Sequence, residues 1–260
     1  MDRFLYKKAA GITVLSAAMS DFSYKPHAHA EYAIGVTESG VQQYHLNGAL
    51  HSSYPGGVMR FSPEQTHDGN AGDRSGIRYV MLYVPAGLVT EITGQREIRE
   101  FHKPIVYNPI LAGNILELSA GVFADTDEAL LVERLMAIAE ESFMADVVPA
   151  KAKPPDFTKA VQIMHESTDI TLKLDEICHE LQLSKYHFIR SFKKSMGISP
   201  YQYYLNCKLV RAKVLLDQGQ DVYRAVCDCG FFDLAHLNRH FKQVYGVTAY
   251  QYRQCMKQTG

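Results

Sequence analysis

Two arginines, Arg190 and Arg239, lie 49 residues apart at the same position of a repeated sequence pattern. Residues 184–203 are SKYHFIRSFKKSMGISPYQY, and residues 233–252 are DLAHLNRHFKQVYGVTAYQY. Each copy also carries a lysine three residues after its arginine. A guanidinium group can donate two hydrogen bonds to the edge of a guanine, or bind a phosphate oxygen. Self-similarity at a fixed spacing indicates two copies of one structural unit, each with the same basic side chains.

Each copy is predicted to form a helix with defined ends. Ser184 and Asp233 are residue types that cap helix N-termini, because their side-chain oxygens accept hydrogen bonds from backbone N–H groups. Gly197 and Gly246 stand where a left-handed residue ends a helix. Apolar residues recur every four positions in the first copy and predict one buried stripe, formed by Phe188, Phe192 and Met196.

A shorter amphipathic helix is predicted before each copy, at residues 174–181 and 222–229. Helix, turn and second helix with a basic outer face are the parts of a helix-turn-helix motif, whose second helix enters the DNA major groove. A long helix is predicted between the motifs at residues 200–217, where Ser199 is the cap and Pro200 takes the first turn. At about 1.5 Å per residue it can separate two recognition helices by about one DNA turn.

The last 100 residues resemble the DNA-binding domain of the AraC (arabinose-regulator) family of bacterial transcription regulators. The resemblance rests on LDEICHELQLSKYHFIRSFKKSMGISPYQYYLNCKLVRAKVLL and CGFFDLAHLNRHFKQVYGVTAYQYR. It implies sequence-specific binding to double-stranded DNA. The chain departs from the family pattern at a few positions: Cys178 and Val226 replace a small alanine, Gln182 replaces a turn glycine, Ala249 replaces a proline, and Leu234 and Ala235 replace polar residues.

The side chains off the apolar stripes are the predicted DNA contacts. In the first copy they are Lys185, Tyr186, His187, Ile189, Arg190, Lys193 and Lys194. In the second copy they are Leu234, Ala235, His236, Asn238, Arg239 and Lys242. The arginines are candidates for guanine, with phosphate as the alternative, and the later lysines are predicted to bind phosphate. The second copy is predicted to be less specific, because apolar side chains cannot distinguish donor and acceptor patterns.

The charge of the chain is divided unequally. Residues 157–260 carry 14 Lys and Arg against 9 Asp and Glu, a net charge of +5, whereas residues 1–156 carry −6. A basic domain favours phosphate contact. With 260 residues the chain suits two domains. We predict domains at 1–146 and 157–260, joined by a linker at 147–156 that contains two adjacent prolines.

The N-terminal half is predicted to be a β-barrel followed by helices. Short apolar segments between residues 11 and 84 alternate with turn signals, which is typical of a double-sheet barrel. HAHAEYAIGVTESG and PGGVMRFSPEQTHDGN resemble the two cupin motifs. Helices are predicted at 87–101, 109–123 and 126–145. The predicted fold class is α+β, with a cupin-like barrel followed by an all-α domain with two tandem helix-turn-helix motifs.

Three histidines are the candidate binding residues of the barrel. His27, His29 and His67, with Tyr32, are predicted to bind a small-molecule effector, as the resemblance implies. Three imidazoles can also hold a divalent metal, and a third interpretation is that they are structural. A metal cupin usually adds a glutamate a few residues after the histidine pair, which this chain lacks. We therefore do not expect the protein to require a cofactor.

These patterns together predict a transcription regulator that binds specific DNA sequences under the control of a small molecule and is not an enzyme. The alternative is a metal-dependent cupin enzyme fused to a DNA-binding domain.

In the regulators that this chain resembles, a helix such as 126–145 pairs two subunits, and this predicts a homodimer. The alternative is that the helix packs on its own barrel. One face of the helix is formed by Leu131, Leu135, Ile138 and Ser142. RNA polymerase is a further partner that the resemblance implies. The N-terminal segment is interpreted as a strand and not a secretory signal, no membrane span is expected, and the five cysteines fit reduced thiols, so we expect a cytoplasmic protein.

Overall fold

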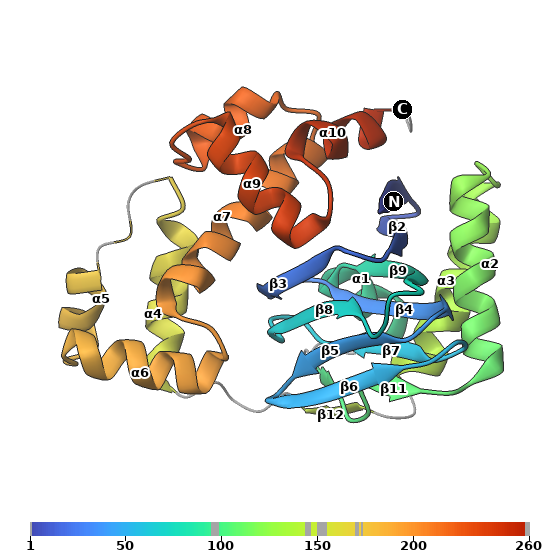
Figure 1. The fold of residues 1–260 in the computed structure, drawn as a ribbon, viewed down its shortest axis with the longest axis horizontal. Coiled ribbons are helices and arrows are strands. Elements are labelled where there is room, and N and C mark those ends of the chain that lie inside the picture. Colours follow the sequence, from blue (N-terminus) through green and yellow to red (C-terminus); the bar gives the residue numbers. More distant parts are fainter. Residues whose placement is uncertain are drawn as a thin grey trace. The chain divides into compact units, whose positions relative to one another are not determined.

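The computed structural model describes residues 2–94, 99–143, 147–149, 155–169, 172 and 174–257, without the side chains at 99, 147–149, 155, 156 and 186. The chain forms two compact units, made chiefly of residues 2–149 and 155–254. The first unit contains the sheets and the second is helical (Figure 1). This arrangement confirms the predicted fold class.

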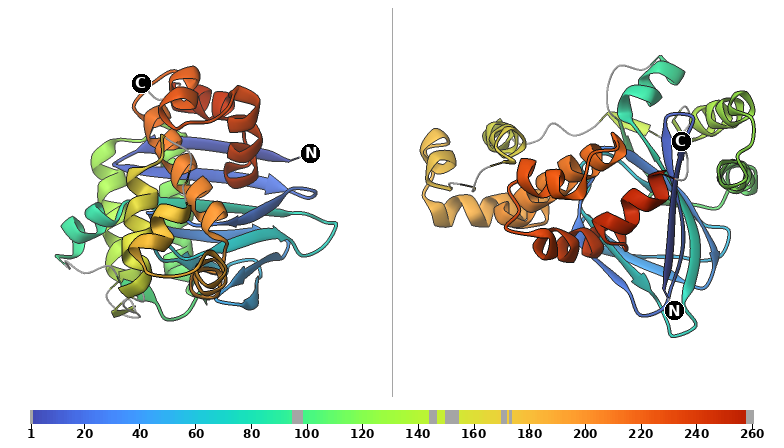
Figure 2. Two further views of the ribbon diagram at one scale, coloured as in Figure 1. Left: turned by 90° about the vertical axis from the view of Figure 1, so that its left-hand side faces the viewer. Right: turned by 90° about the horizontal axis from the view of Figure 1, so that it is seen from above.

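Two antiparallel sheets form the N-terminal unit (Figure 2). The six-stranded sheet has the order β1-β2-β9-β4-β7-β11 and the four-stranded sheet has the order β3-β8-β5-β6. The strands are β1 (Arg3–Ala9), β2 (Ile12–Met19), β3 (Ser23–His27), β4 (Tyr32–Ser39), β5 (Gln42–Leu46), β6 (Ala49–Ser53), β7 (Val58–Phe61), β8 (His67–Ala71), β9 (Ile77–Val84) and β11 (Ile105–Val106).

Both faces of the larger sheet are buried, and alternation along β4 separates them. Ile34 and Val36 belong to an apolar cluster on one face. Ala33 and Gly35 point to the other face, toward the four-stranded sheet. The two sheets meet there, since the Phe61 ring of β7 lies 4.9 Å from the Tyr44 ring of β5.

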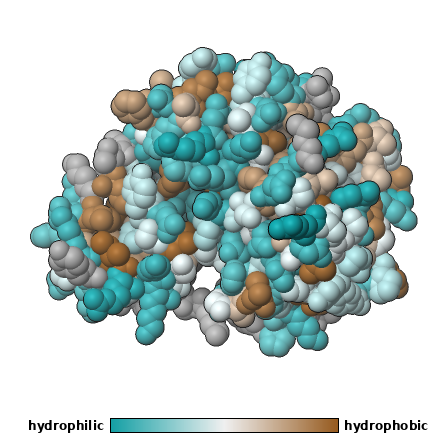
Figure 3. Space-filling view, viewed as in Figure 1, coloured by the Kyte–Doolittle hydropathy of each residue, from teal (hydrophilic) through white to brown (hydrophobic). Residues whose placement is uncertain are grey.

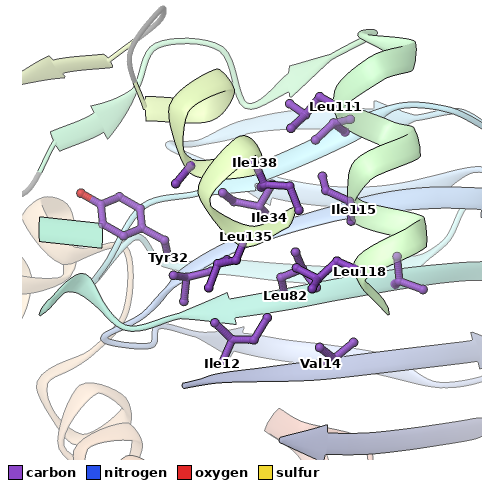
Figure 4. Close-up of a cluster of buried hydrophobic side chains, with 14 of the residues drawn as sticks. Ile12, Val14, Tyr32, Ile34, Leu82, Leu111, Ile115, Leu118, Leu135 and Ile138 are labelled. Carbon is purple, nitrogen blue, oxygen red and sulfur yellow. The ribbon is translucent and has the colours of Figure 1, made fainter. Parts of the chain in front are cut away.

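Three helices cover the outer face of the six-stranded sheet: α1 (Ala86–Thr93), α2 (Pro109–Phe123) and α3 (Glu128–Phe143). Asn108 begins α2 by accepting hydrogen bonds from the backbone N–H groups of Ile110 and Leu111, at 3.0 and 3.2 Å. The apolar faces of α2 and α3 pack on the sheet in one cluster with Ile12, Ile34 and Leu82 (Figure 4).

Two predicted boundaries in this unit were wrong. The helix predicted at 87–101 ends at Thr93, where Gly94 adopts a left-handed conformation with φ 69°. Its last three residues instead form β10 (Arg99–Phe101), which pairs with β12 (Val147–Pro149). The first three residues of the predicted linker therefore belong to a strand of the N-terminal unit.

The C-terminal unit consists of α4 (Pro155–Glu166), α5 (Leu174–Glu180), α6 (Lys185–Met196), α7 (Pro200–Asp217), α8 (Val222–Asp228), α9 (Leu234–Tyr245) and α10 (Ala249–Lys257). The pairs α5–α6 and α8–α9 are the two predicted helix-turn-helix motifs, and α7 joins them. Ser199 caps α7 with a reciprocal capping box that includes Gln202. The predicted bounds of α7 are confirmed at both ends.

The turn inside each motif contains one residue in the left-handed conformation. Gln182 has φ 53° and Gly230 has φ 57°, both in the left-handed region. A side chain at Gly230 would place its Cβ 2.5 Å from the backbone oxygen of Asp169, so the second turn requires glycine. Gln182 is exposed and adopts the same conformation at a cost that glycine avoids.

Candidate nucleic-acid interface

The first recognition helix, α6, has the ends that its sequence predicts. The Ser184 hydroxyl accepts a hydrogen bond from the His187 N–H at 3.3 Å. Gly197 ends the helix in the left-handed region with φ 78°. Phe188 and Phe192 are fully buried in the core of the unit, so the opposite face of α6 is turned to solvent.

That outer face of α6 carries the predicted contacts of the first copy. The exposed residues are Lys185, His187, Ile189, Arg190, Lys193 and Lys194. Lys185 forms an ion pair with Asp175 of α5 at 2.7 Å, which engages its ammonium within the motif. Ile189 is 37% exposed, so it is not part of the core. The side chain of Tyr186 lies outside the described residues.

The second recognition helix, α9, repeats this geometry. Asp233 accepts from the His236 N–H at 2.6 Å, and Gly246 ends the helix with φ 76°. Leu237 and Phe241 are fully buried. On the outer face of α9, three of the predicted contacts are exposed: Ala235, Arg239 and Lys242. The other three are half-buried: Leu234, His236 and Asn238. The surface over α9 is mainly hydrophilic, with hydrophobic atoms over α8 (Figure 3).

Asn238 has a hydrogen-bond partner within the fold as well as a predicted role in DNA recognition. Its Oδ1 accepts a hydrogen bond from the backbone N–H of Ala249, the first residue of α10, at 3.0 Å. In the first copy the matching residues are Ile189 and Pro200, and proline has no N–H to donate. Asn238 therefore supplies a hydrogen-bond acceptor for the backbone N–H of Ala249. Pro200 has no N–H and needs no such acceptor, and Ile189 offers none. The Asn238 oxygen thus already has one partner within the fold.

Lys208 on α7 is a buried residue that the sequence analysis missed. Its Nζ donates to the backbone oxygen of Gly230 at 2.8 Å and lies 5.0 Å from the centre of the Tyr204 ring. Burial lowers the pKa of this ammonium. Lys208 thus fastens α7 to the turn of the second motif and helps to fix where α9 lies. A lysine between the apolar residues Cys207 and Leu209 of a long helix was the available signal.

The three candidate histidines are buried and held by backbone carbonyl oxygens. Nδ1 of His27 lies 2.7 Å from the oxygen of Lys25. Nδ1 of His29 lies 2.8 Å from that of Glu31, and Nδ1 of His67 lies 2.9 Å from that of Gln65. A carbonyl oxygen only accepts, so each Nδ1 carries a proton and donates it.

His29 and His67 belong to a continuous set of aromatic contacts between the two sheets. Their ring centres are 5.0 Å apart. The His67 ring stacks on Phe61 at 4.1 Å, and the His29 ring lies 5.4 Å from Tyr83. Burial is the largest cause of the raised pKa of the Tyr83 hydroxyl. The surroundings of these two histidines are therefore largely aromatic.

Two interpretations of this region need correction. Tyr32 lies on the helix-covered face of β4 (Figure 4), with its ring 4.8 Å from Phe143. It therefore faces away from the sheet face where the His29 ring contacts Tyr83. Among the described residues, no group of three or more His, Cys, Asp or Glu side chains could hold a metal ion. The metal site proposed for His27, His29 and His67 is thus not supported by the geometry.

The apolar face of α3 packs on its own domain. Leu131, Leu135 and Ile138 are each at most 2% exposed and join the cluster beneath α2 and the six-stranded sheet. This face cannot also pair two subunits. Other apolar side chains of α3 remain open to solvent, including Val132 at 39% and Met136 at 43% exposure. No helix in the described part of the chain is both long and apolar enough to cross a membrane.

Two capped recognition helices, joined by α7 and attached to a double-sheet domain, define a DNA-binding transcription regulator with a ligand-binding domain. The comparisons with known proteins agree with this class. A model described as an AraC-like ligand binding domain matches residues 9–139, and one described as a helix-turn-helix domain matches residues 177–254. The chain belongs to the AraC family of transcription regulators.

Similar curated proteins carry names of regulators. An uncharacterised HTH-type transcriptional regulator, YbfI of Bacillus subtilis, is 28% identical over 221 residues, which are 81% of this chain and 80% of that protein. The HTH-type transcriptional regulator ArgR of Pseudomonas aeruginosa is 30% identical over 46% of this chain and 37% of its own length. A more distant match is the bifunctional transcriptional activator/DNA repair enzyme Ada of Escherichia coli, 25% identical over 45% of this chain and 36% of that protein.

The fold as a whole matches that of ToxT from Vibrio cholerae. A structure of wild-type ToxT with an unsaturated fatty acid bound superposes with a TM-score of 0.59, covering 97% of this chain and 94% of that one. The two sequences are 11% identical, so the likeness concerns the fold.

Proposed function

We propose that the exposed faces of α6 and α9 contact successive major grooves of one DNA site, and that a small molecule bound near His29 and His67 controls this binding. The observation that carries the proposal is the repeated geometry of the two helices, each capped at both ends and each presenting an arginine outward. Arg190 and Arg239 are both exposed and occupy the same position of the repeat.

The proposed contacts differ in kind along each helix. Arg190 and Arg239 lie in the N-terminal half, where a recognition helix approaches base edges. Lys193, Lys194 and Lys242 lie in the last turn and bind phosphates. His187 and His236 follow the caps and contribute donors near the backbone of the DNA.

DNA affinity is expected to fall steeply with salt. Each neutralised phosphate releases counterions, so four such contacts reduce affinity about tenfold for each doubling of salt. The measurement is fluorescence anisotropy of the full chain on a duplex recovered by binding-site selection, from low to physiological ionic strength. Lys194→Ala should lower the slope by about 1 without changing base preference. An affinity that does not vary with salt would contradict phosphate contact by this surface.

The effector site is proposed for the aromatic region between the two sheets. His29 and His67 are buried there beside the half-buried Tyr83, and the ToxT structure with a fatty acid bound supports small-molecule binding by a protein of this fold. His27 is buried at the end of β3 and is retained in the proposed site. Effector binding must favour one arrangement of the chain over another, because otherwise it cannot regulate.

Replacing His27, His29 and His67 with alanine is expected to abolish stabilisation by the effector. A ligand at 100 times its Kd stabilises a protein by about 2.7 kcal/mol, which raises the Tm measurably. Compounds that raise the Tm of the wild-type chain are therefore retested on the triple variant. His45→Ala is the matched control, because His45 is 60% exposed at its side chain and pairs with Asp68. If the Tm shift persists in the triple variant, these histidines are structural.

Homodimerisation is proposed for the outer face of α2 and α3 and not for the buried face. Exposed apolar residues on these helices support this choice: Ile110, Leu116, Leu130, Val132 and Met136.

Free thiols at all five cysteines support a cytoplasmic setting, where DNA is also found. A contact with RNA polymerase belongs to the same proposal and is assigned to no particular residue.

A further inference from the structure

Phe232 is an exposed aromatic residue at the tip of the second helix-turn-helix motif. It lies in the turn between α8 and α9, directly before the cap residue Asp233, and it is 91% exposed. A single exposed apolar residue is common on protein surfaces, but a phenylalanine with nearly all of its surface in water is a candidate contact.

The first motif has no counterpart of Phe232. The left-handed turn residues Gln182 and Gly230 are 48 positions apart, whereas the caps Ser184 and Asp233 are 49 apart. The turn of the second motif is therefore one residue longer. Phe232 is the residue that this extra length places outside the core, while Phe231 before it is buried.

The backbone of Phe232 is fixed to the recognition helix. Its N–H donates to Nδ1 of His236 at 3.3 Å. A backbone N–H only donates, so Nδ1 of His236 is the acceptor and the proton of the neutral ring is on Nε2. The His236 ring also contacts Phe231, with ring centres 5.5 Å apart, and His240, at 4.8 Å. Phe232 is thus held at the start of α9.

Phe232 forms one wall of a hollow of about 450 Å³ at this end of α9, lined by Phe232, Asp233, Ala235, His236 and Arg239. The phenyl ring and the Ala235 methyl group are apolar, and the Arg239 guanidinium is a donor on the same helix. The major-groove edge of thymine presents a methyl group beside the O4 acceptor. The hollow therefore combines surfaces that match both features of thymine.

We propose that Phe232 is a specificity-determining residue that packs against a thymine methyl group in the half of the DNA site bound by the second motif. This inference rests on the proposed placement of α9 in a major groove. It adds a base preference to a motif in which Arg239 is the main polar candidate for a base contact, since the Asn238 oxygen accepts from Ala249. The contact would also remove an exposed apolar ring from water.

The test removes the methyl group from the DNA and the ring from the protein. A duplex selected by the full chain is remade with each thymine of the second half-site replaced in turn by deoxyuridine, which lacks only the 5-methyl group. At one position the wild-type chain should bind the deoxyuridine duplex about fourfold more weakly, the effect of one buried methyl group. Phe232→Ala should bind both duplexes equally.

Tyr223→Ala is the matched control, because Tyr223 is a 66% exposed aromatic residue on α8 of the same motif. This variant should keep the wild-type preference for thymine. If Phe232→Ala retains the preference, or if it weakens binding to both duplexes while their ratio is unchanged, the inference is overturned. Selection that recovers no duplex overturns the proposed DNA binding itself and this inference with it. Equal Tm values for wild type and variant establish that the fold is intact.

Discussion

Replacing Arg190 with alanine is expected to relax base preference in the half of the DNA site bound by the first motif. Arg190 is exposed on the outer face of α6, between the fully buried Phe188 and Phe192 on its inner face. Loss of a bidentate contact to guanine reduces discrimination by about 1–3 kcal/mol, or roughly five- to 150-fold. The measurement is binding-site selection with the wild-type chain and the variant, followed by titration of single-base substitutions.

Arg239→Ala is expected to weaken DNA affinity about as much as Arg190→Ala does. It should change the base preference at fewer positions of the DNA site. Fewer polar groups surround Arg239, since Leu234 and Ala235 are apolar and the Asn238 oxygen accepts from Ala249. Lys193→Ala controls for charge, because this lysine lies in the last turn of α6 and should weaken binding to all sequences alike. If Arg190→Ala also weakens all sequences equally, Arg190 binds phosphate.

We predict that the second motif is less sequence-specific than the first. This prediction is contradicted if the half-site bound by the second motif proves as selective as the other half-site in every variant. The preference would then come from the shape and deformability of the DNA, since few base contacts are available from α9. Selection on Phe232→Ala separates these cases, because a direct methyl contact disappears with the ring whereas a shape preference does not.

The sequence predicted the helical unit well because its signals are local. Caps at Ser184 and Asp233, glycines at Gly197 and Gly246, and a four-residue apolar spacing each depend on residues within one turn. The repeat doubled each signal, so an ambiguous position in one copy was resolved by the other. The structure confirms these helix ends to within one or two residues.

The features that the sequence did not predict depend on contacts between distant segments. β10 is a strand because it pairs with β12, 46 residues or more later in the chain, although its sequence continues a helical pattern. Tyr32 is the first residue of β4, a strand whose two faces are both buried, so the pattern gave no sign of which face bears the ligand site. Lys208 was overlooked because its acceptor is 22 residues away.

Asn238 illustrates why a candidate contact can have a structural role. Seen alone, an asparagine on the outer part of a recognition helix is the residue type that binds adenine. Its actual partner is the N–H of Ala249, which is fully buried at the first position of α10. In the first copy Pro200 occupies that position and the residue facing it in the repeat is Ile189. The two pairs are therefore alternative solutions for the same helix start.

Replacing Asn238 with isoleucine is expected to destabilise the chain by about 1–3 kcal/mol, because the buried Ala249 N–H loses its acceptor. Adding Ala249→Pro should restore most of this loss, since proline removes the donor and is favoured at the first helical position. Ile189→Asn is the matched control in the first copy and should change stability by less than about 0.5 kcal/mol, because Pro200 offers no donor.

The measurement is a double-mutant cycle in urea, followed by circular dichroism at the helical wavelength, with the coupling energy as the result. We expect a coupling energy of at least about 1 kcal/mol in favour of the isoleucine–proline pair. Isoleucine alone leaves the buried N–H of residue 249 without an acceptor, whereas proline removes that N–H. If the double variant is no more stable than Asn238→Ile alone, the hydrogen bond to Ala249 contributes nothing. Asn238 would then be available for DNA, and the second motif would recover a base-specific contact.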